Sequence, residues 1–423
     1  MSDQTLNLEF TEFDLPNGLH CILYQDNTKP NVCVMPAYQV GSKDEVKGQK
    51  GIAHLFEHMM FQGSENVSKT GHFDSVMKAG GTCNAFTGFD STVYFDLLPS
   101  NKLELALWLE SDRMNSLNIT QTNLDNQISV VLEEKKQVMD NIPYGTMTSN
   151  YLMNVFKGSQ YEISVIGLEE DIKSFTVKEA LNFHNNYYSP ENCVLMISGD
   201  INIEKTKDLI NKYFGSINKK NLIQREENII TELKKNDSMT VEDNVQLSIV
   251  SVCFQIPGEE SREDFDLEYF TEIIANRESS RLHKKYVYEK NLFKSVHANK
   301  ICLKEAGILI IFAMLNPGTD TEQAAKILND EVKLFYESEI NDREFERIRN
   351  QLEFRDVTKN LIMNNISIET VKNYMNFKDT SLINSSFKKF SKVTKADVKE
   401  TVKRYLIDRN NFTLNYIPKI KIQ

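Results

Sequence analysis

Short strand and helix patterns alternate over the first 145 residues of the chain. Apolar side chains recur at every second position between residues 7 and 40, which predicts strands, and Pro16-Asn17-Gly18 predicts the turn of a hairpin. Glycine and proline separate the segments that follow, where we expect helices at 51–61, 70–79, after Pro99 and at 122–140, and paired strands at 83–86 and 92–98. This alternation predicts a mixed α+β domain.

The second half of the chain repeats this theme at a fixed distance. An apolar strand pattern that ends at Pro99 leads into an amphipathic helix, and the strand pattern that ends at Pro317 leads into a helix at 324–334. The offset between the two prolines is 317 − 99 = 218 residues. It places the counterpart of the 51–61 helix near 266–275, where no histidine stands. We therefore predict two homologous domains, only the first of which has kept a metal site.

The length of the chain supports this division. At 423 residues it is too long for one ordinary core and long enough for two domains of about 200 residues each. We predict an N-terminal domain over 1–217 and a C-terminal domain over 238–423. The polar and charged stretch 218–237 is the predicted linker between them.

Charge and cysteine content narrow the class of protein. The formal net charge of −11 argues against a nucleic-acid partner or an anionic membrane surface. The six cysteines are scattered singly, which favours reduced thiols over a disulfide framework. No apolar run reaches the ~18 residues that a membrane span needs, and the first residues lack the features of a signal peptide. We expect a cytoplasmic protein, or a periplasmic one if a signal peptide has been removed.

The segment His54-Leu55-Phe56-Glu57-His58 carries the strongest chemical signal. Positions i and i+4 of a helix share a face, so both imidazoles can reach one metal ion with Glu57 beside it. Two neutral imidazoles and a third ligand leave a tetrahedral zinc one open position for water, whose proton Glu57 can take. The alternative is a pair of core histidines, but the chain has only seven histidines in all. The pattern predicts metal-assisted hydrolysis.

The third metal ligand is expected on the helix at 122–140, which offers the adjacent residues Glu133 and Glu134. Periodicity distinguishes them, because one stripe of this helix should pack inward. That stripe consists of Gln127, Val131, Glu134 and Val138. Glu133 lies on a more solvated stripe. We therefore predict Glu134 as the ligand, the alternative being that both are surface glutamates.

These residues and their spacing resemble the pitrilysin, insulysin and mitochondrial-processing-peptidase family of zinc metallopeptidases, whose signature is the H-x-x-E-H order. Glu134 follows His58 by 134 − 58 = 76 residues. The similarity is to the short bacterial members, covers the whole chain and is strongest over 40–145. The flanking segments that agree are Gly41-Ser42-Lys43-Asp44-Glu45, Gly51-Ile52-Ala53, Met59-Met60-Phe61, Asn84-Ala85-Phe86-Thr87, the run from Ala106 to Met114, and Asp140 to Gly145.

The resemblance implies zinc bound by His54, His58 and Glu134, with Glu57 as the general base. It also implies two α+β domains, each a mixed, largely antiparallel sheet packed with helices. Two such chains are expected to close a chamber around an extended peptide.

Two further roles follow from the resemblance. The strand Asn84-Ala85-Phe86-Thr87 resembles the edge that takes the substrate backbone by β-augmentation, the alternative being an ordinary edge strand. In many relatives a glutamate stands seven residues before the third ligand. Here that position is Gln127. We predict only that it hydrogen-bonds to a metal ligand without binding the metal itself.

The chain also departs from the family pattern. Many relatives carry an Arg and a Tyr, seven residues apart after a Ser-Ser-Arg-Leu run, that bind the substrate carbonyl. Here Ser279-Ser280-Arg281-Leu282 is present, but Val287 and Lys294 stand at those two positions. A missing donor of this kind costs roughly a hundred- to a thousand-fold in rate.

The leading hypothesis is a zinc endopeptidase that acts on unfolded peptides or leader segments. We expect it to be the catalytic subunit of a heterodimer whose homologous partner carries the Arg/Tyr pair. A self-sufficient homodimer, in which Lys294 or another donor substitutes, is the alternative. A non-catalytic scaffold subunit is disfavoured because all four site residues are present, and a hydrolase of small substrates is disfavoured by the implied chamber.

Overall fold

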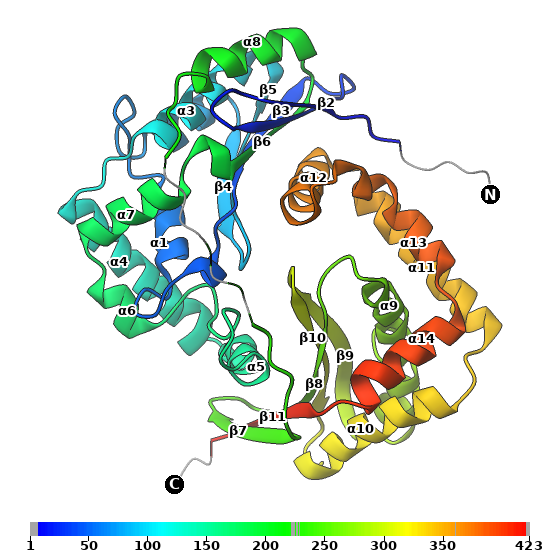
Figure 1. Cartoon of the computed structure of the whole chain (residues 1–423). Coiled ribbons are helices and arrows are strands. Elements are labelled where there is room, and N and C mark those ends of the chain that lie inside the picture. The colour runs from blue at the N-terminus through cyan, green and yellow to red at the C-terminus, as the bar shows by residue number, and fades with distance from the viewer. Residues whose placement is uncertain (1–6, 221–224, 226, 228, 360, 420–423) are drawn as a thin grey trace. The chain divides into compact units, whose positions relative to one another are not determined.

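The computed structural model describes residues 7–220, 225, 227, 229–359 and 361–419, which form two compact units (Figure 1). The first unit comprises Met1–Lys135, Ile163–Glu227 and Val357–Ser385; the second comprises Lys136–Glu162, Asn228–Asp356 and Ser386–Gln423. Each unit has a sheet packed with helices and a hydrophobic core of its own. The predicted α+β class is confirmed.

The first unit is built on a six-stranded sheet of order β1-β2-β6-β3-β5-β4. All neighbouring strands are antiparallel except β2 and β6. The predicted hairpin is present, since β1 pairs with β2 around the Pro16-Asn17-Gly18 turn. The strands are β1 (Thr11–Asp14), β2 (His20–Gln25), β3 (Asn31–Tyr38), β4 (Thr82–Thr87), β5 (Thr92–Pro99) and β6 (Cys193–Gly199).

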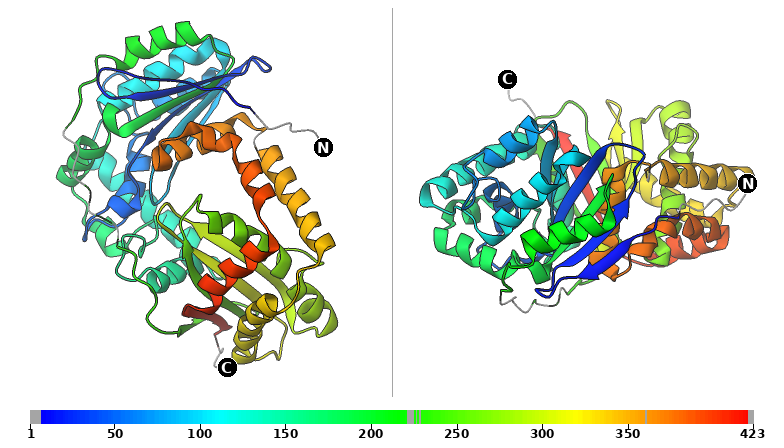
Figure 2. Two further views of the ribbon diagram at one scale, coloured as in Figure 1. Left: turned by 45° about the vertical axis from the view of Figure 1, so that its right-hand side comes forward. Right: turned by 90° about the horizontal axis from the view of Figure 1, so that it is seen from above.

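Helices cover both faces of this sheet, so its central strands are buried on both sides. Val32 and Val34 face one helix layer, whereas Cys33 and Met35 face α12. Figures 1 and 2 show the large layer on one face and α12 on the other. The large layer comprises α1 (Ile52–Met59), α2 (Gly71–Lys78), α3 (Leu103–Asn115), α4 (Gln121–Lys135), α6 (Glu169–Ser174), α7 (Val177–Tyr187) and α8 (Ile203–Phe214); α12 is Met363–Phe377.

The second unit has a five-stranded sheet of order β7-β11-β8-β10-β9. Only β7 and β11 are parallel. The strands are β7 (Asp237–Asp243), β8 (Ile249–Pro257), β9 (Phe293–Cys302), β10 (Ala306–Leu315) and β11 (Asn411–Pro418). The helices are α5 (Met147–Val155), α9 (Arg262–Ile274), α10 (Thr321–Glu337), α11 (Asp342–Lys359), α13 (Ser386–Lys392) and α14 (Lys395–Val402), with α11 reaching into the first unit at its end.

The two sheets have equivalent topologies. In chain order, β2 to β6 give the arrangement β2-β6-β3-β5-β4, and β7 to β11 give the arrangement β7-β11-β8-β10-β9. The single parallel pair occupies the same place in both. β5 and α3 correspond to β10 and α10, as the 218-residue offset predicts, and α9 corresponds to the motif helix α1. The prediction of two homologous domains is confirmed.

The domain boundaries differ from the uninterrupted ranges 1–217 and 238–423. The segment 136–162 belongs to the second unit, where Tyr151 on α5 donates a hydrogen bond to Ser251 on β8 at 2.7 Å. Conversely, 357–385 belongs to the first unit, where Ser367 on α12 and Ser198 on β6 are 2.7 Å apart. Each sheet would otherwise expose an apolar face, and amphipathic segments from distant parts of the chain cover it. Residues 221–224, 226 and 228 of the predicted linker lie outside the described residues.

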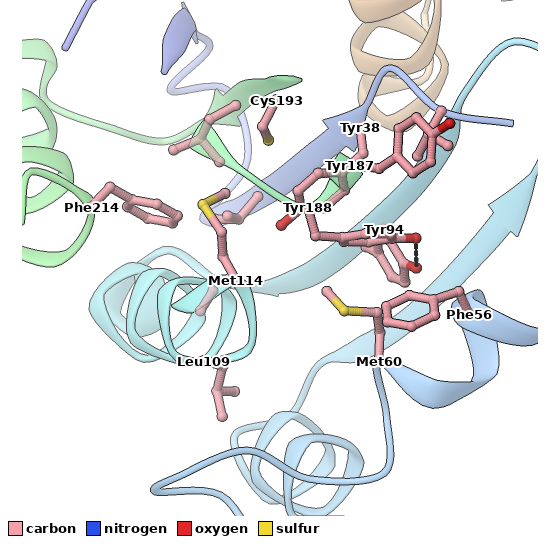
Figure 3. Close-up of a cluster of buried hydrophobic side chains, with 14 of the residues drawn as sticks. Tyr38, Phe56, Met60, Tyr94, Leu109, Met114, Tyr187, Tyr188, Cys193 and Phe214 are labelled. Atoms are coloured by element: carbon pink, nitrogen blue, oxygen red, sulfur yellow. Dashed lines mark hydrogen bonds between the residues drawn. The ribbon is translucent and has the colours of Figure 1, made fainter. Parts of the chain in front are cut away.

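The core beneath the motif helix is rich in aromatic side chains (Figure 3). Phe56 on α1 packs against Tyr188, with ring centroids 4.8 Å apart, and Tyr188 Oη lies 2.9 Å from Tyr94 Oη. Leu55, Phe56 and Met59 are buried, whereas His54, Glu57 and His58 are only partly buried. Burying the apolar face of α1 therefore fixes which way the polar face points.

The start of the motif helix is fixed by a buried carboxylate. Glu45, only 6% exposed, accepts hydrogen bonds at 2.9 Å from the backbone N–H groups of both Gly51 and Ala53. These are among the N–H groups that a helix leaves without an internal partner. Gly51 itself has φ +103°, and a Cβ there would come within 2.8 Å of the Ile166 carbonyl oxygen. Glu45 therefore anchors α1 where the chain turns too tightly for a larger residue.

No helix among the described residues is long and apolar enough to cross a lipid bilayer.

We expect Glu45→Ala to lower the free energy of unfolding by about 1–3 kcal/mol, because two buried N–H groups lose their acceptor. Thermal denaturation followed by circular dichroism measures this. The matched control is Glu204→Ala, which removes an exposed glutamate that pairs with Lys207 three residues on. Equal melting temperatures for the two variants would contradict the anchoring role.

Candidate metal centre

The two histidines of the motif lie on one face of α1 and their rings are close. The ring centroids of His54 and His58 are 5.0 Å apart, as expected for residues one helical turn apart. The packing of the buried side of α1 fixes the backbone from which both rings project. Their Nε2 atoms face the neighbouring helix α4.

Glu134 on α4 completes a three-residue cluster. Its Oε2 lies 3.8 Å from His54 Nε2 and 3.4 Å from His58 Nε2, and all three ligand atoms lie within 4.8 Å of one another. The structure therefore brings together the three residues that the sequence predicts as ligands. Glu133, the rejected neighbour, is exposed.

The stripe that singled out Glu134 is only partly buried. Gln127 and Val131 are buried as expected, but Val138 is 45% exposed, so its inward placement was wrong. The reason is local: α4 ends at Lys135 and the chain continues as a π-helical turn over Lys136–Asp140, which breaks the helical period. The choice of Glu134 does not depend on Val138.

The surroundings favour the neutral form of both imidazoles. Burial and the nearby His58 together lower the pKa of His54 to about 4. Burial also lowers the pKa of His58, while Glu134 and a hydrogen bond with Gln127 act in the opposite direction. Neutral rings present lone pairs, so three electron-pair donors converge on one point, which suits a metal cation. The contact with Gln127 agrees with the hydrogen-bonding role predicted for it.

Glu57 lies beside this cluster and is held by the edge strand. Thr87 Oγ1 at the end of β4 donates a 2.6 Å hydrogen bond to Glu57 Oε2, and the backbone N–H of Thr87 also donates to this carboxylate. Burial raises the pKa of Glu57, the Thr87 bonds lower it, and the Glu134 carboxylate raises it. The sequence pointed to Thr87 only as part of a substrate-binding strand. Its hydrogen bond to Glu57 left no signal in the sequence, because it depends on how α1 packs on β4.

The strand with Asn84 to Thr87 is an edge strand. Within the described residues, β4 pairs only with β5. The N–H of Ala85 is bonded to the Asn84 side chain at 2.9 Å and therefore points away from β5. By strand alternation, the main-chain groups of Cys83, Ala85 and Thr87 face the free edge, while those of Asn84 and Phe86 face β5.

Two positions depart from the family pattern. The residue that stands in place of the Arg cannot donate a hydrogen bond to a carbonyl oxygen. Val287 lies in the π-helical turn His283–Glu289 and packs against the core of the second unit. Lys294 is exposed on β9, the strand that corresponds to β4.

Comparisons with known proteins agree with this fold. Residues 21–168 match the family model described as Insulinase (Peptidase family M16), and residues 174–352 match the model described as Peptidase M16 inactive domain. The two matches together span both homologous domains. The chain is thus a two-domain protein of the metallopeptidase type.

Individual relatives point the same way. The zinc protease PqqE of Helicobacter pylori is 29% identical over 342 residues, covering 79% of this chain and 76% of that protein. A crystal structure of a protease from Helicobacter pylori superposes with a TM-score of 0.89 at 24% identity, covering 97% of this chain and 100% of that one. A peptidase M16 inactive domain from Pseudomonas fluorescens superposes with a TM-score of 0.86 at 13% identity, covering 98% of each chain. This chain belongs to peptidase family M16, as one of its short members.

Proposed function

We propose that this chain is a zinc-dependent endopeptidase with His54, His58 and Glu134 as metal ligands and Glu57 as the general base. The observation that carries the proposal is the convergence of two neutral imidazoles and one carboxylate on a single point, with a second carboxylate beside it. A relative named as a zinc protease supports the choice of metal. A non-catalytic scaffold would have no need of all four residues.

Zinc bound in this cluster supplies a Lewis acid that polarises a peptide carbonyl and a water molecule. Glu57 would take a proton from the attacking water and then pass it to the leaving amine. Its raised pKa makes the carboxylate a stronger base than an exposed glutamate. Thr87 fixes the position of the carboxylate through a bond to the oxygen Oε2. Gln127 orients the His58 ring from behind.

An extended peptide fits the free edge of β4. The substrate would pair with the main chain of Ala85, two residues from the Thr87 that holds the base, so the cleaved bond lies next to Glu57. Pairing requires the Asn84 side chain to leave the Ala85 N–H that it now occupies. Main-chain recognition of this kind selects unfolded or extended segments and tolerates many sequences. Leader segments and unfolded peptides are therefore the proposed substrates.

The proposed assembly is a heterodimer that closes a chamber around the peptide. Val287 is packed into a core and cannot donate a hydrogen bond to a carbonyl oxygen. A homologous partner that carries the Arg/Tyr pair would supply that stabilisation. The competing assembly is a homodimer in which Lys294, which is exposed, takes this role. The compartment, cytoplasm or periplasm, stays a prediction from sequence.

His58→Ala and Glu134→Gln should each lower the zinc content by about one ion per chain relative to the wild type, because three ligands are the minimum for a catalytic zinc site. Metal analysis of the purified proteins measures this. Glu133→Gln is the control and should keep the wild-type zinc content. Full zinc in His58→Ala would refute the ligand assignment.

Glu57→Gln should keep the zinc and the fold but lose peptide hydrolysis by roughly a hundred- to ten-thousand-fold, because an amide cannot accept the proton of the water. The assay is cleavage of an unstructured fluorogenic peptide, with zinc content measured on the same preparation. If Glu57→Gln and Glu134→Gln lose zinc to the same extent, the separation of base from ligand is wrong.

The isolated chain should hydrolyse an unstructured peptide slowly, and addition of a subunit with the Arg/Tyr pair should raise the rate by roughly a hundred- to a thousand-fold. The control is the same subunit with its Arg and Tyr replaced by Val and Lys. Full activity from the isolated chain, unchanged by any partner, would exclude the heterodimer and leave the zinc assignment standing.

A further inference from the structure

A second group of metal-binding side chains lies inside the first unit, away from Glu57. The ligand atoms of His72 on α2, Cys83 on β4 and Asp96 on β5 all lie within 4.8 Å of one another. His72 and Asp96 are buried and Cys83 is partly buried. Cys83 and Asp96 face each other directly across the β4–β5 ladder. Two strands and a helix therefore direct a nitrogen, a sulfur and an oxygen donor to one place.

A fourth donor group and a buried cation border this cluster. His72 Nε2 lies 3.0 Å from Asp96 Oδ1 and 4.0 Å from Glu110 Oε1 on α3. Arg113 donates two hydrogen bonds to Glu110, at 2.7 and 2.5 Å. Asp96, which is 0% exposed, has a second oxygen, Oδ2, that receives no hydrogen bond from any N–H or hydroxyl group in the described part of the chain. The Asp96 carboxyl does share a hydrogen bond with the adjoining Glu110 carboxyl, and the proton of that bond is what a metal ion would displace.

The charges of the cluster do not balance. His72, Asp96, Glu110 and Arg113 are all buried. Arg113 offsets one of the two buried carboxylates, Asp96 and Glu110, and one negative charge is left over. A buried site with an excess negative charge takes up either a proton or a cation.

We propose that His72, Cys83 and Asp96 form a second divalent-metal site, suited to zinc, with Glu110 as the adjoining carboxylate. The donor set of imidazole, thiolate and carboxylate is one that zinc accepts. A tetrahedral zinc with bonds of about 2.0–2.3 Å holds its ligand atoms roughly 3.3–3.6 Å apart. Since the ligand atoms of the cluster lie within 4.8 Å of one another, no pair has to approach by more than about 1.5 Å. Uptake of one divalent ion releases two protons, one from the Cys83 thiol and one shared by Asp96 and Glu110. The site is then neutral overall.

This site has a structural role that is independent of the proposed peptidase chemistry. Cys83 and Thr87 lie on the same strand and face, four residues apart, or about 13 Å at 3.3 Å per residue. The second metal would tie β4 to α2 at one end, while Thr87 ties β4 to α1 at the other. It would hold the edge strand in place whether or not the first site contains zinc.

Cobalt substitution tests the proposal on the full chain. The first site contains no thiolate, so a thiolate-to-cobalt charge-transfer band in the near ultraviolet reports the second site alone. We expect His58→Ala, loaded with Co²⁺, to keep this band and to bind about one metal ion per chain. Adding Cys83→Ser to His58→Ala should abolish the band.

The control is Cys302→Ser, which removes the other partly buried cysteine, next to Asp264 in the second unit, and should keep the band. If folded, cobalt-treated His58→Ala shows no band, the proposal is overturned and the cluster is a network of side chains that share a proton. Persistence of the band in the Cys83→Ser variant would also overturn it. Since His58→Ala leaves the cluster intact, a failure of Cys83→Ser to fold does not affect the first result.

Discussion

The packing of one short helix determines the chemistry of this protein. The apolar side of α1 is held by Phe56 against Tyr188, and its first turn is held by the Glu45 carboxylate. Because the position and rotation of α1 are both fixed, the side chains of His54, Glu57 and His58 can point in only one direction. The site then needs only Glu134, from the neighbouring helix α4, to complete a set of three ligands. A helix free to rotate would lose this convergence.

The same burial sets the charge states that the chemistry requires. Removal from water keeps His54 and His58 neutral, and therefore able to bind a cation, and it makes Glu57 more basic. Burial by itself shifts Glu57 toward its protonated form, which cannot act as a base. The two hydrogen bonds from Thr87 act against it, so the edge strand that is proposed to bind the peptide also keeps the base ionisable. In the proposed function, Thr87 thus lies on the strand that binds the peptide and also holds the base.

Much of this arrangement is readable from sequence because it depends on local periodicity. The i, i+4 spacing of His54 and His58, the placement of Glu134 beside them, and the 218-residue repeat all survive in the structure, although the stripe that contains Glu134 is inward only as far as Glu134 itself. Other features depend on which distant segment covers a given surface, and no local pattern encodes that. The exchange of 136–162 and 357–385 between the two units is one example. The bond from Thr87 to Glu57 and the cluster around His72 are others, since each joins residues from separate elements.

The second unit shows which part of the motif helix serves the fold and which part serves the chemistry. Adding the offset to the three motif positions gives 54 + 218 = 272, 57 + 218 = 275 and 58 + 218 = 276, occupied by Glu272, Ala275 and Asn276. None of these forms a cluster with other metal-binding groups in the described residues.

Nevertheless, Asn276 Oδ1 accepts a 2.8 Å hydrogen bond from the backbone N–H of Ala298 on β9, the edge strand equivalent to β4. In the first unit, Glu57 accepts the backbone N–H of Thr87 in the same manner. In both units a side chain near the end of this helix therefore binds the edge strand, and this contact persists where the histidines are absent. The contact does not come from equivalent positions, because Asn276 aligns with His58 rather than with Glu57 and lies beyond the end of α9. What the two units share is a helix packed on an edge strand, and the proposed chemistry of the first unit adds two histidines and a carboxylate to it.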